Sequence, residues 1–293
     1  MYSGDRFSPE IKERAERVTS RIELHFVRHG EKENDKTKPD EMIELTETGR
    51  GQARSKAHDD DITQSVSFGS PRVRTQQTAG LMMSGGLDGI TGDESLEELR
   101  AKLNKDLAIG SKMAVEKRLN FNLDLSKEYV KKAMEASERN EWLKFLVEQS
   151  DDLVTSLDDA ESDSYSRIAG RIAEIVKKYL DIAPRFDKLA QDEKKNVEDT
   201  LKRFLGTHQG IGESFLAKVI EKTKGISMRD AFVSALGNQG FGYAEGFDVQ
   251  VETVDGKKQT VRISFKKEKD GQTLFEFNEL VPKELIEEMI LQK

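Results

Sequence analysis

The sequence predicts an α/β fold: a three-layer, doubly wound, mostly parallel sheet with helices on both faces. Three observations predict it. Short apolar runs alternate with polar loops and helical patterns towards both ends of the chain. The middle of the chain carries long amphipathic helical patterns without a clear strand. Near the C-terminus, apolar residues alternate on both sides of an Asp255–Gly256 turn, which predicts an antiparallel hairpin.

The N-terminal third alternates between helix and strand patterns. Ser8, Thr46 and Ser70 are good N-cap residues, and a proline follows Ser8 and Ser70 at the first helical position. The expected order is helix 8–21, strand 22–27, helix 45–57, strand 65–70 and helix 70–83. Such an order is typical of βαβ units and therefore of parallel strands.

The rest of the chain divides into a helical block and a second α/β block. The helical block is expected to contain helices at 126–149, 164–183 and 186–203. The second block is expected to contain strand 202–209, helices 212–223 and 228–236, hairpin 247–265, strand 268–277 and helix 282–293. We therefore expect an α/β core formed by residues 1–104 and 200–293. Residues 105–199 would form a helical insertion that caps one end of the sheet.

Composition narrows the class of protein. The chain has 293 residues, 35% of them hydrophobic, which is enough for a substantial core. A net charge of −8 argues against general binding to nucleic acids or to membrane surfaces. Because cysteine is absent, disulfides, thiolate metal sites and cysteine nucleophiles are excluded. No apolar run reaches transmembrane length and no secretory signal pattern opens the sequence, so a cytoplasmic protein is expected.

The tripeptide Arg28-His29-Gly30 directly follows the first predicted strand. In open α/β sheets, ligands bind beyond the carboxyl ends of the strands, where a histidine can act as a nucleophile or a base. Arg28 can hold a phosphate or carboxylate with two parallel donors, and Gly30 leaves room for a close approach of backbone to a ligand. By itself, the tripeptide is better explained as a surface turn after a strand.

Two further segments carry similar signals. Arg74 lies in the first turn of a predicted helix, where free N–H groups and the helix dipole attract anions. His208 stands where another apolar strand gives way to glycines, so it could reach the same crevice as His29. Taken singly, a solvated arginine and a buried structural histidine remain alternatives.

Four ordered segments together resemble the histidine phosphatase superfamily, also called the phosphoglycerate mutase-like family, branch 1. They are "RHG" after the first strand, "LTETGRGQA", "SPRVRTQQTA", and the late strand that ends in His208. The resemblance covers about 22–100 and 200–225 well, and the last strands loosely. It implies that the helical insertion is a substrate cap.

The resemblance also implies roles for individual residues. His29 would accept the phosphoryl group, while Arg28 and Arg74 would bind its oxygens and His208 would add a further donor. These groups position the phosphoryl group and spread its negative charge without a metal or another cofactor. Gly30, Glu31 and Gln209 would border the bound substrate.

A carboxyl group is expected to protonate the leaving alkoxide. The resemblance assigns this role to Glu98 in "DESLEELRAKL", although the glycine-aromatic continuation typical of the family is missing. Asp93 and Glu94 are close competitors. Glu213, five residues after His208, is a further candidate, which could instead position its helix.

The favoured function is a metal-independent phosphomonoester hydrolase that acts on a small phosphorylated substrate or a phosphohistidine protein. A phosphoglycerate mutase-type phosphotransferase and a non-catalytic phospholigand-binding protein remain alternatives. Without a general acid, an enzyme of this kind would still cleave phosphates with good leaving groups. Other features are interpreted as structural: "GNQGFG" (237–242) as a turn that could border the active site, Trp142 and Phe145 as cap core, and His25 and His58 as structural or exposed residues.

Overall fold

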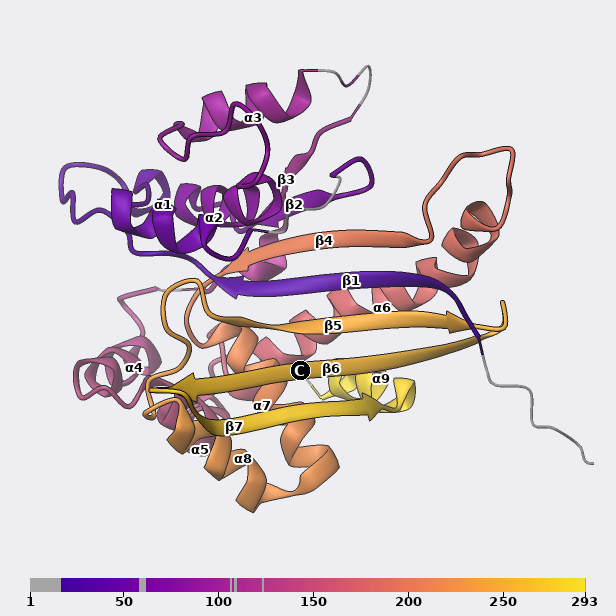
Figure 1. The fold of residues 1–293 in the computed structure, drawn as a ribbon. Coiled ribbons are helices and arrows are strands. Elements are labelled where there is room, and N and C mark those ends of the chain that lie inside the picture. The colour runs from indigo at the N-terminus through magenta and orange to yellow at the C-terminus, as the bar shows by residue number, and fades with distance from the viewer. Residues whose placement is uncertain (1–16, 58–61, 106, 108–109, 123, 293) are drawn as a thin grey trace, which may run out of the picture.

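The computed structural model describes residues 17–57, 62–105, 107, 110–122 and 124–292. In these residues, seven strands form one sheet in the order β3-β2-β4-β1-β5-β6-β7 (Figure 1). The strands are β1 (Val18–Arg28), β2 (Val66–Gly69), β3 (Met113–Val115), β4 (Thr200–Thr207), β5 (Gly246–Val254), β6 (Lys258–Lys269) and β7 (Gln272–Val281). β3, β2, β4 and β1 are parallel, and β5 to β7 continue the sheet in antiparallel pairs. The predicted α/β class and the C-terminal antiparallel hairpin are confirmed.

β1 is the central strand of the sheet, and its residues alternate between the two faces. Ile22, Leu24 and Phe26 are buried in one hydrophobic cluster, while His25 points to the other face and stacks on Phe204. The strand begins at Val18, so the helix predicted for 8–21 is wrong at its last four positions. There the antiparallel partner β5 supplies backbone hydrogen bonds that a local pattern cannot reveal. The first part of that predicted helix lies outside the described residues.

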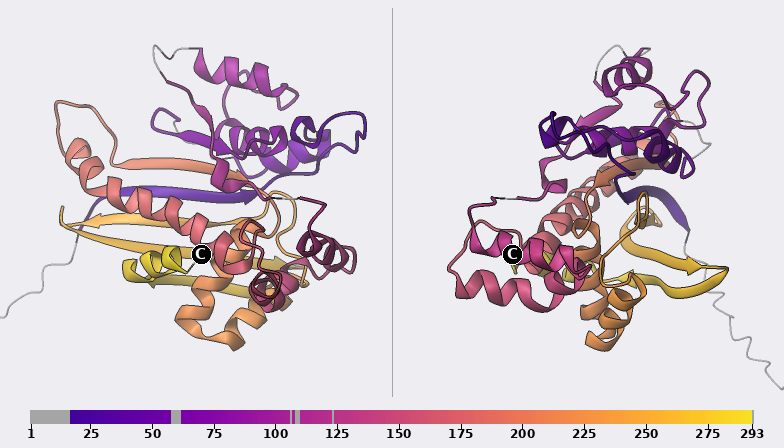
Figure 2. Two further views of the ribbon diagram at one scale, coloured as in Figure 1. Left: turned by 180° about the vertical axis from the view of Figure 1, so that it is seen from behind. Right: turned by 90° about the vertical axis from the view of Figure 1, so that its left-hand side faces the viewer.

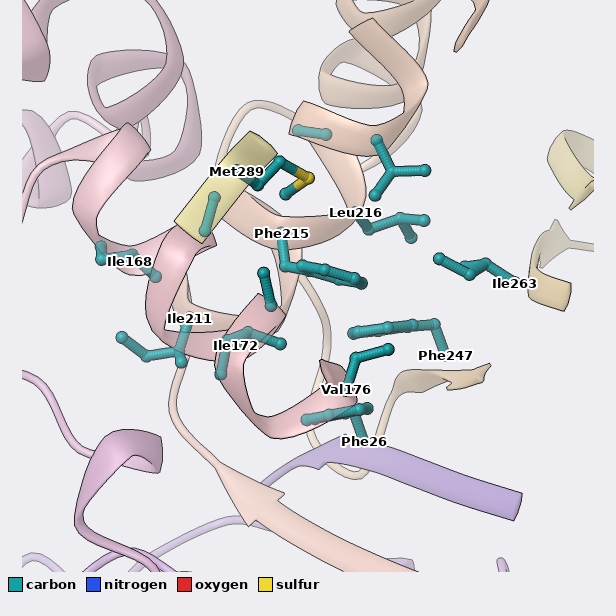
Figure 3. Packing of buried hydrophobic residues seen from close by; sticks show 14 of the residues in the cluster. Phe26, Ile168, Ile172, Val176, Ile211, Phe215, Leu216, Phe247, Ile263 and Met289 are labelled. Carbon is teal, nitrogen blue, oxygen red and sulfur yellow. The ribbon is translucent and has the colours of Figure 1, made fainter. Parts of the chain in front are cut away.

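Two hydrophobic clusters lie on opposite faces of the sheet, because neighbours Phe204 and Leu205 of β4 contribute to different ones. One face packs against α1 (Glu47–Arg54), α2 (Val73–Ser84) and α3 (Leu96–Asn104). The other packs against α6 (Tyr165–Ala190), α7 (Ile211–Lys224), α8 (Ile226–Ala235) and α9 (Lys283–Leu291). Seen from behind, α6 runs across β1 and β5 (Figure 2). Phe26, Phe247 and Phe215 stack between β1 and α7 (Figure 3).

The helical block 105–199 differs from its prediction in three respects. The helix predicted at 126–149 is two helices, α4 (Glu128–Glu138) and α5 (Trp142–Ser156), separated by Asn140 with a left-handed φ of 59°. The helix predicted at 164–183 continues through Pro184 to Ala190 as α6, whereas the helix predicted at 186–203 is wrong after Ala190, because residues 191–199 are not helical and β4 begins at Thr200. β3, which no sequence pattern predicted, pairs with β2 at the edge of the sheet. Capping of a substrate by this block stays a prediction.

Short elements before and after α2 shape the site. The predicted Thr46 cap is confirmed, since its hydroxyl accepts a hydrogen bond from Gly49 N at the start of α1. The helix predicted from Pro71 begins instead at Val73, and Ser70 Oγ accepts from Arg72 N without capping the helix. Single 3₁₀ turns lie at Asp40–Met42 and Lys117–Leu119.

None of the described helices has the length and apolar character needed to cross a bilayer.

Candidate active site

A cavity of about 390 Å³ lies beyond the carboxyl ends of β1 and β4. Arg28 pairs with Thr207 across these parallel strands, so His29 and His208 follow neighbouring strand ends. Both histidines line the cavity together with Arg28 and Arg74. The structure therefore brings together the four residues that the sequence singles out, although they lie up to 180 positions apart in the chain.

His29 is buried and held in one tautomer. Its Nδ1 lies 2.6 Å from the carbonyl oxygen of Gly30, which can only accept, so Nδ1 carries the proton. Burial, together with the positive charges of Arg74 and Arg28, lowers the pKa of His29 to about 3. At neutral pH the ring is therefore uncharged, and Nε2 keeps its lone pair for attack on an electrophile.

Gly30 is required by chain packing. A Cβ atom at Gly30 would lie 2.4 Å from the carbonyl oxygen of Gly49, and one at Gly49 would lie 2.0 Å from that of Glu31. The two glycines thus let the start of α1 press against the loop after β1. Thr78 Oγ1 accepts a hydrogen bond from Gly30 N and fixes this loop to α2.

Arg28 lies between the cavity and a buried carboxyl group. Its guanidinium donates to the carbonyl oxygen of Phe241 and stacks over the Tyr243 ring, with Cζ 4.6 Å from the ring centroid. Burial lowers the pKa of Arg28, while the nearby Glu213 and Tyr243 oppose this shift. The turn predicted at 237–242 therefore does border the site.

Arg74 contacts an internal anion that the sequence analysis did not single out. Its Nη1 donates to the Asp40 carbonyl oxygen at 2.7 Å, and its Nη2 lies 3.1 Å from Asp40 Oδ2. Arg72 and Lys32 also form ion pairs with the Asp40 carboxylate. Burial lowers the pKa of both Arg72 and Arg74 to about 10. Three cations thus surround one half-exposed carboxylate beside the cavity.

His208 is almost completely buried, and its ring meets that of His29 edge-on at a centroid distance of 5.4 Å. Its Nε2 lies 2.9 Å from Ser70 Oγ. Burial holds the pKa of His208 well below its usual range, and His29 and Arg74 depress it further. Its Nδ1 is buried and has no hydrogen-bond partner in the described part of the chain.

Three buried polar atoms at this cavity lack a partner among the described residues: Arg28 Nε, Arg74 Nε and His208 Nδ1. An unsatisfied buried donor costs about 1–3 kcal/mol. Such a concentration of unpaired donors on three neighbouring residues matches an oxyanion, whose oxygens would accept from them. The arrangement can bind a tetrahedral anion next to the free Nε2 of His29.

The carboxyl groups that the sequence nominates as acids do not line the cavity. Glu98 is exposed, and its carboxylate accepts from Ser95 N at 2.8 Å in a capping box of α3. Asp93 is also exposed. Glu94 is buried, and its pKa falls, against the effect of burial, to about 2 because Lys102 and backbone N–H groups donate to it. The structure therefore uses these residues to shape the turn and helix before and within α3.

Glu213 and Glu31 serve as supports for loops. Glu213 is completely buried, and it accepts from Gly210 N at 2.9 Å and from Phe241 N at 2.7 Å. Burial raises its pKa, and the two backbone donors oppose that shift. Glu31 accepts from Thr46 Oγ1 at 2.8 Å and so joins the loop after β1 to α1. Gln209 does line the cavity, as predicted, and its Nε2 donates to Gln239 O.

The opposite wall of the cavity is apolar and comes largely from the helical block. Val130, Ala133 and Met134 of α4 face it, and Trp142, at the start of α5, adds its ring. Trp142 packs against the core as predicted and also lines the cavity, and Phe145 is buried in the core. The 130, 133, 134 and 137 spacing on one helix face was the signal available in the sequence. His25 is structural, and His58 lies outside the described residues.

Comparisons with known proteins agree with the sequence resemblance. Residues 24–109 match the model of the histidine phosphatase superfamily (branch 1). No curated protein matches the chain significantly. The likeness to solved structures is weak. A structure titled mycobacterial hydrolase 2 is 16% identical, with 94% of this chain and 99% of that chain covered and a TM-score of 0.46.

Two further solved structures carry phosphatase titles. For a mycobacterial glucosyl-3-phosphoglycerate phosphatase, the identity is 17%, the covered shares are 83% and 96%, and the TM-score is 0.42. For a phosphoserine phosphatase from Entamoeba histolytica, the identity is 16%, the covered shares are 80% and 95%, and the TM-score is 0.39. The match over residues 24–109 confirms the resemblance found in the sequence, and the segment that carries Arg28, His29 and Arg74 belongs to the histidine phosphatase superfamily, branch 1.

Proposed function

We propose that the protein is a phosphomonoester hydrolase that works through a phosphohistidine at His29, without a metal ion. The observation that carries the proposal is the fixed tautomer of this residue. The Gly30 carbonyl oxygen holds the Nδ1 proton, so Nε2 is available as a nucleophile beside Arg28, Arg74 and His208. The family match and the unpaired buried donors of the same cavity support it.

In the first step, His29 Nε2 attacks the phosphorus atom and the ester P–O bond breaks. The phosphoryl group is then bonded to Nε2, and the leaving oxygen keeps the bonding electron pair and takes up one proton from the solvent. Arg28, Arg74 and His208 would donate to the phosphoryl oxygens as negative charge spreads over them. Because both guanidinium groups are in place before the substrate arrives, little reorganisation is needed.

In the second step, water attacks the phosphorus atom and the P–N bond breaks. Inorganic phosphate leaves, and the attacking water loses one proton to the solvent. His29 returns to its neutral form with the Nδ1 proton still donated to Gly30. The cycle is balanced: one ester and one water give one alcohol or phenol and one phosphate.

The leaving group is expected to be a weak base. Among the described residues that line the cavity, Asp163 is the only carboxylate, and it is bound to Arg171 at 2.6 Å and to Asn122 N at 2.7 Å. Both of its carboxylate oxygens are engaged by these donors. We therefore infer that aryl phosphates, acyl phosphates and phosphohistidine are cleaved faster than simple alkyl phosphates. Small phosphorylated molecules and phosphohistidine proteins both remain within this class, and a cytoplasmic location suits either.

The test is turnover of an aryl phosphate together with capture of the intermediate. The wild-type protein should release phosphate, and mass spectrometry after an alkaline quench should find one phosphoryl group on the peptide that contains residue 29. His29→Ala should abolish both signals. His25→Gln is the matched control, because His25 lies on β1, the strand that leads to His29, but contacts Asp248 instead of the cavity.

Equal turnover by His29→Ala would refute the nucleophile assignment. A folded His29→Ala protein, judged by circular dichroism, is required for that comparison. Transfer of phosphate to a second position of the substrate, with little release to water, would instead indicate a mutase.

A further inference from the structure

The cavity has two chemically different ends. One end carries His29, His208 and the guanidinium groups described above. At the other end, Val130, Ala133 and Met134 of α4 project from one helix face. Leu125, Ile168 and Ile211 complete this surface, which we call the apolar wall. A ligand that fills the cavity must therefore present an anion to one end and hydrocarbon to the other.

Several polar groups near the apolar wall are already engaged with the protein. Trp142 Nε1 donates to Gln209 O at 3.2 Å, and Gln209 Nε2 donates to Gln239 O at 2.9 Å. The Tyr129 hydroxyl donates to the carbonyl oxygen of Asp163, and the Asp163 carboxylate binds Arg171. Hydroxyl groups of a sugar or of glycerol would find few partners here and would lose their hydrogen bonds to water.

Apolar side chains are exposed at the mouth of the cavity. Leu125 is 62% exposed, Met134 is 46% exposed and Tyr243 is 43% exposed. All three line the cavity that contains His29. An apolar ligand that covers them would remove this surface from water, which is favourable in proportion to the area buried.

We propose that the organic group of the substrate is apolar, an aryl group with or without an alkyl extension, and that it packs against the apolar wall while its phosphate meets His29. This inference rests on the proposed function and names its substrate class. The charged end alone would accept any phosphate, so the selection comes from α4 and its neighbours. The helical block thereby acts as the specificity element.

Binding of non-hydrolysable phosphonates tests the inference independently of catalysis. The probes are phenylphosphonate and its 4-methyl, 4-ethyl, 4-propyl and 4-butyl derivatives, whose acidity hardly changes along the series. Each buried methylene contributes about 0.8 kcal/mol, so Kd from titration calorimetry should fall roughly three- to fourfold per added carbon. A Kd that does not change with chain length would overturn the inference.

Met134→Asp places a charge in the apolar wall and should remove most of this dependence on chain length. Met228→Asp is the matched control, since Met228 lies on α8, is 42% exposed and does not line the cavity. It should keep the wild-type dependence. An unchanged dependence in Met134→Asp would overturn the inference as well.

The same experiment separates the two proposals. Chain-length-dependent binding without hydrolysis of the corresponding aryl phosphates would refute the proposed hydrolase and retain the apolar specificity. Hydrolysis of aryl phosphates at rates that do not depend on chain length, together with equal Kd values for all the phosphonates, would support the hydrolase and refute the apolar specificity. A protein that binds none of the phosphonates would refute both.

Discussion

Asp40→Asn is expected to increase the affinity of the site for inorganic phosphate. The Asp40 carboxylate forms ion pairs with Arg72, Arg74 and Lys32 beside the cavity. A substrate phosphate that needs Arg74 must share that guanidinium with this internal anion. Replacing the carboxylate by an amide keeps the shape of the side chain and removes its charge.

The size of the gain in phosphate affinity follows from how exposed the paired side chains are. The Asp40 side chain is 43% exposed, whereas those of Arg72 and Arg74 are 9% and 3% exposed. Ion pairs with one solvated partner contribute about 0.2–1 kcal/mol each. Release of three such interactions is expected to favour phosphate by about 1–2 kcal/mol, or roughly five- to thirtyfold in Kd. Added salt should reduce this gain, because the pairs are partly open to solvent.

Titration calorimetry with inorganic phosphate at pH 7 measures the effect directly. Asp35→Asn is the control, because Asp35 lies in the same loop but bonds to Thr37 and contacts no arginine. Its Kd should equal that of the wild type. Unchanged or weaker phosphate binding by Asp40→Asn would show that the carboxylate orients the arginines and does not compete for them.

Two predictions concern stability. Gly49→Ala should lower the free energy of unfolding by about 1–3 kcal/mol or more, because the new Cβ would meet backbone atoms of Glu31, whereas Gly51→Ala in the same helix has open space and should raise it by up to about 1 kcal/mol. Urea unfolding of both variants checks this, and a Gly49→Ala protein as stable as wild type would contradict the packing argument. Burial alone would lower the pKa of His25, but its hydrogen bond with Asp248 and the other carboxylate nearby outweigh burial and raise it to about 9. The resulting stabilisation is fully present below pH 6.5 and is lost as the pH rises through 9. Between pH 6.5 and 9.5, the free energy of unfolding of the wild type should therefore fall by an amount on the order of 2–3 kcal/mol, and that of His25→Gln should not. Equal decreases in the two proteins would argue against the assignment.

Local signals in the sequence predicted the parts of the fold that depend on neighbouring residues. Thr46 caps α1 as expected, and the Asp255–Gly256 pair, both with positive φ, closes the hairpin between β5 and β6. The meeting of His29 and His208 was predictable because both follow apolar runs, and the carboxyl ends of parallel strands share one edge. The family match later confirmed the resemblance that linked these signals.

Other features depend on contacts that no local pattern contains. α6 continues through Pro184 because its buried residues pack along the sheet and α7, which outweighs one missing backbone hydrogen bond. The place of Asp40 among cations depends on the path of the loop after β1, which has no periodicity to interpret. By contrast, the position of Glu98 had a local signal. Ser95 precedes it by three residues, the spacing of a capping box, and this signal competed with the catalytic interpretation.

The parallel pairing of β1 with β4 has a consequence for biosynthesis. Arg21 pairs with Thr200, so the first strand leaves the ribosome long before its partner exists. At about 5–20 residues per second, the delay is roughly 10–35 s. Throughout that interval both edges of the apolar stretch Ile22–Val27 lack their neighbours, because β4 and β5 are both still to be synthesised. A nascent chain of this protein therefore exposes an apolar strand to pairing with other chains until translation has passed β5.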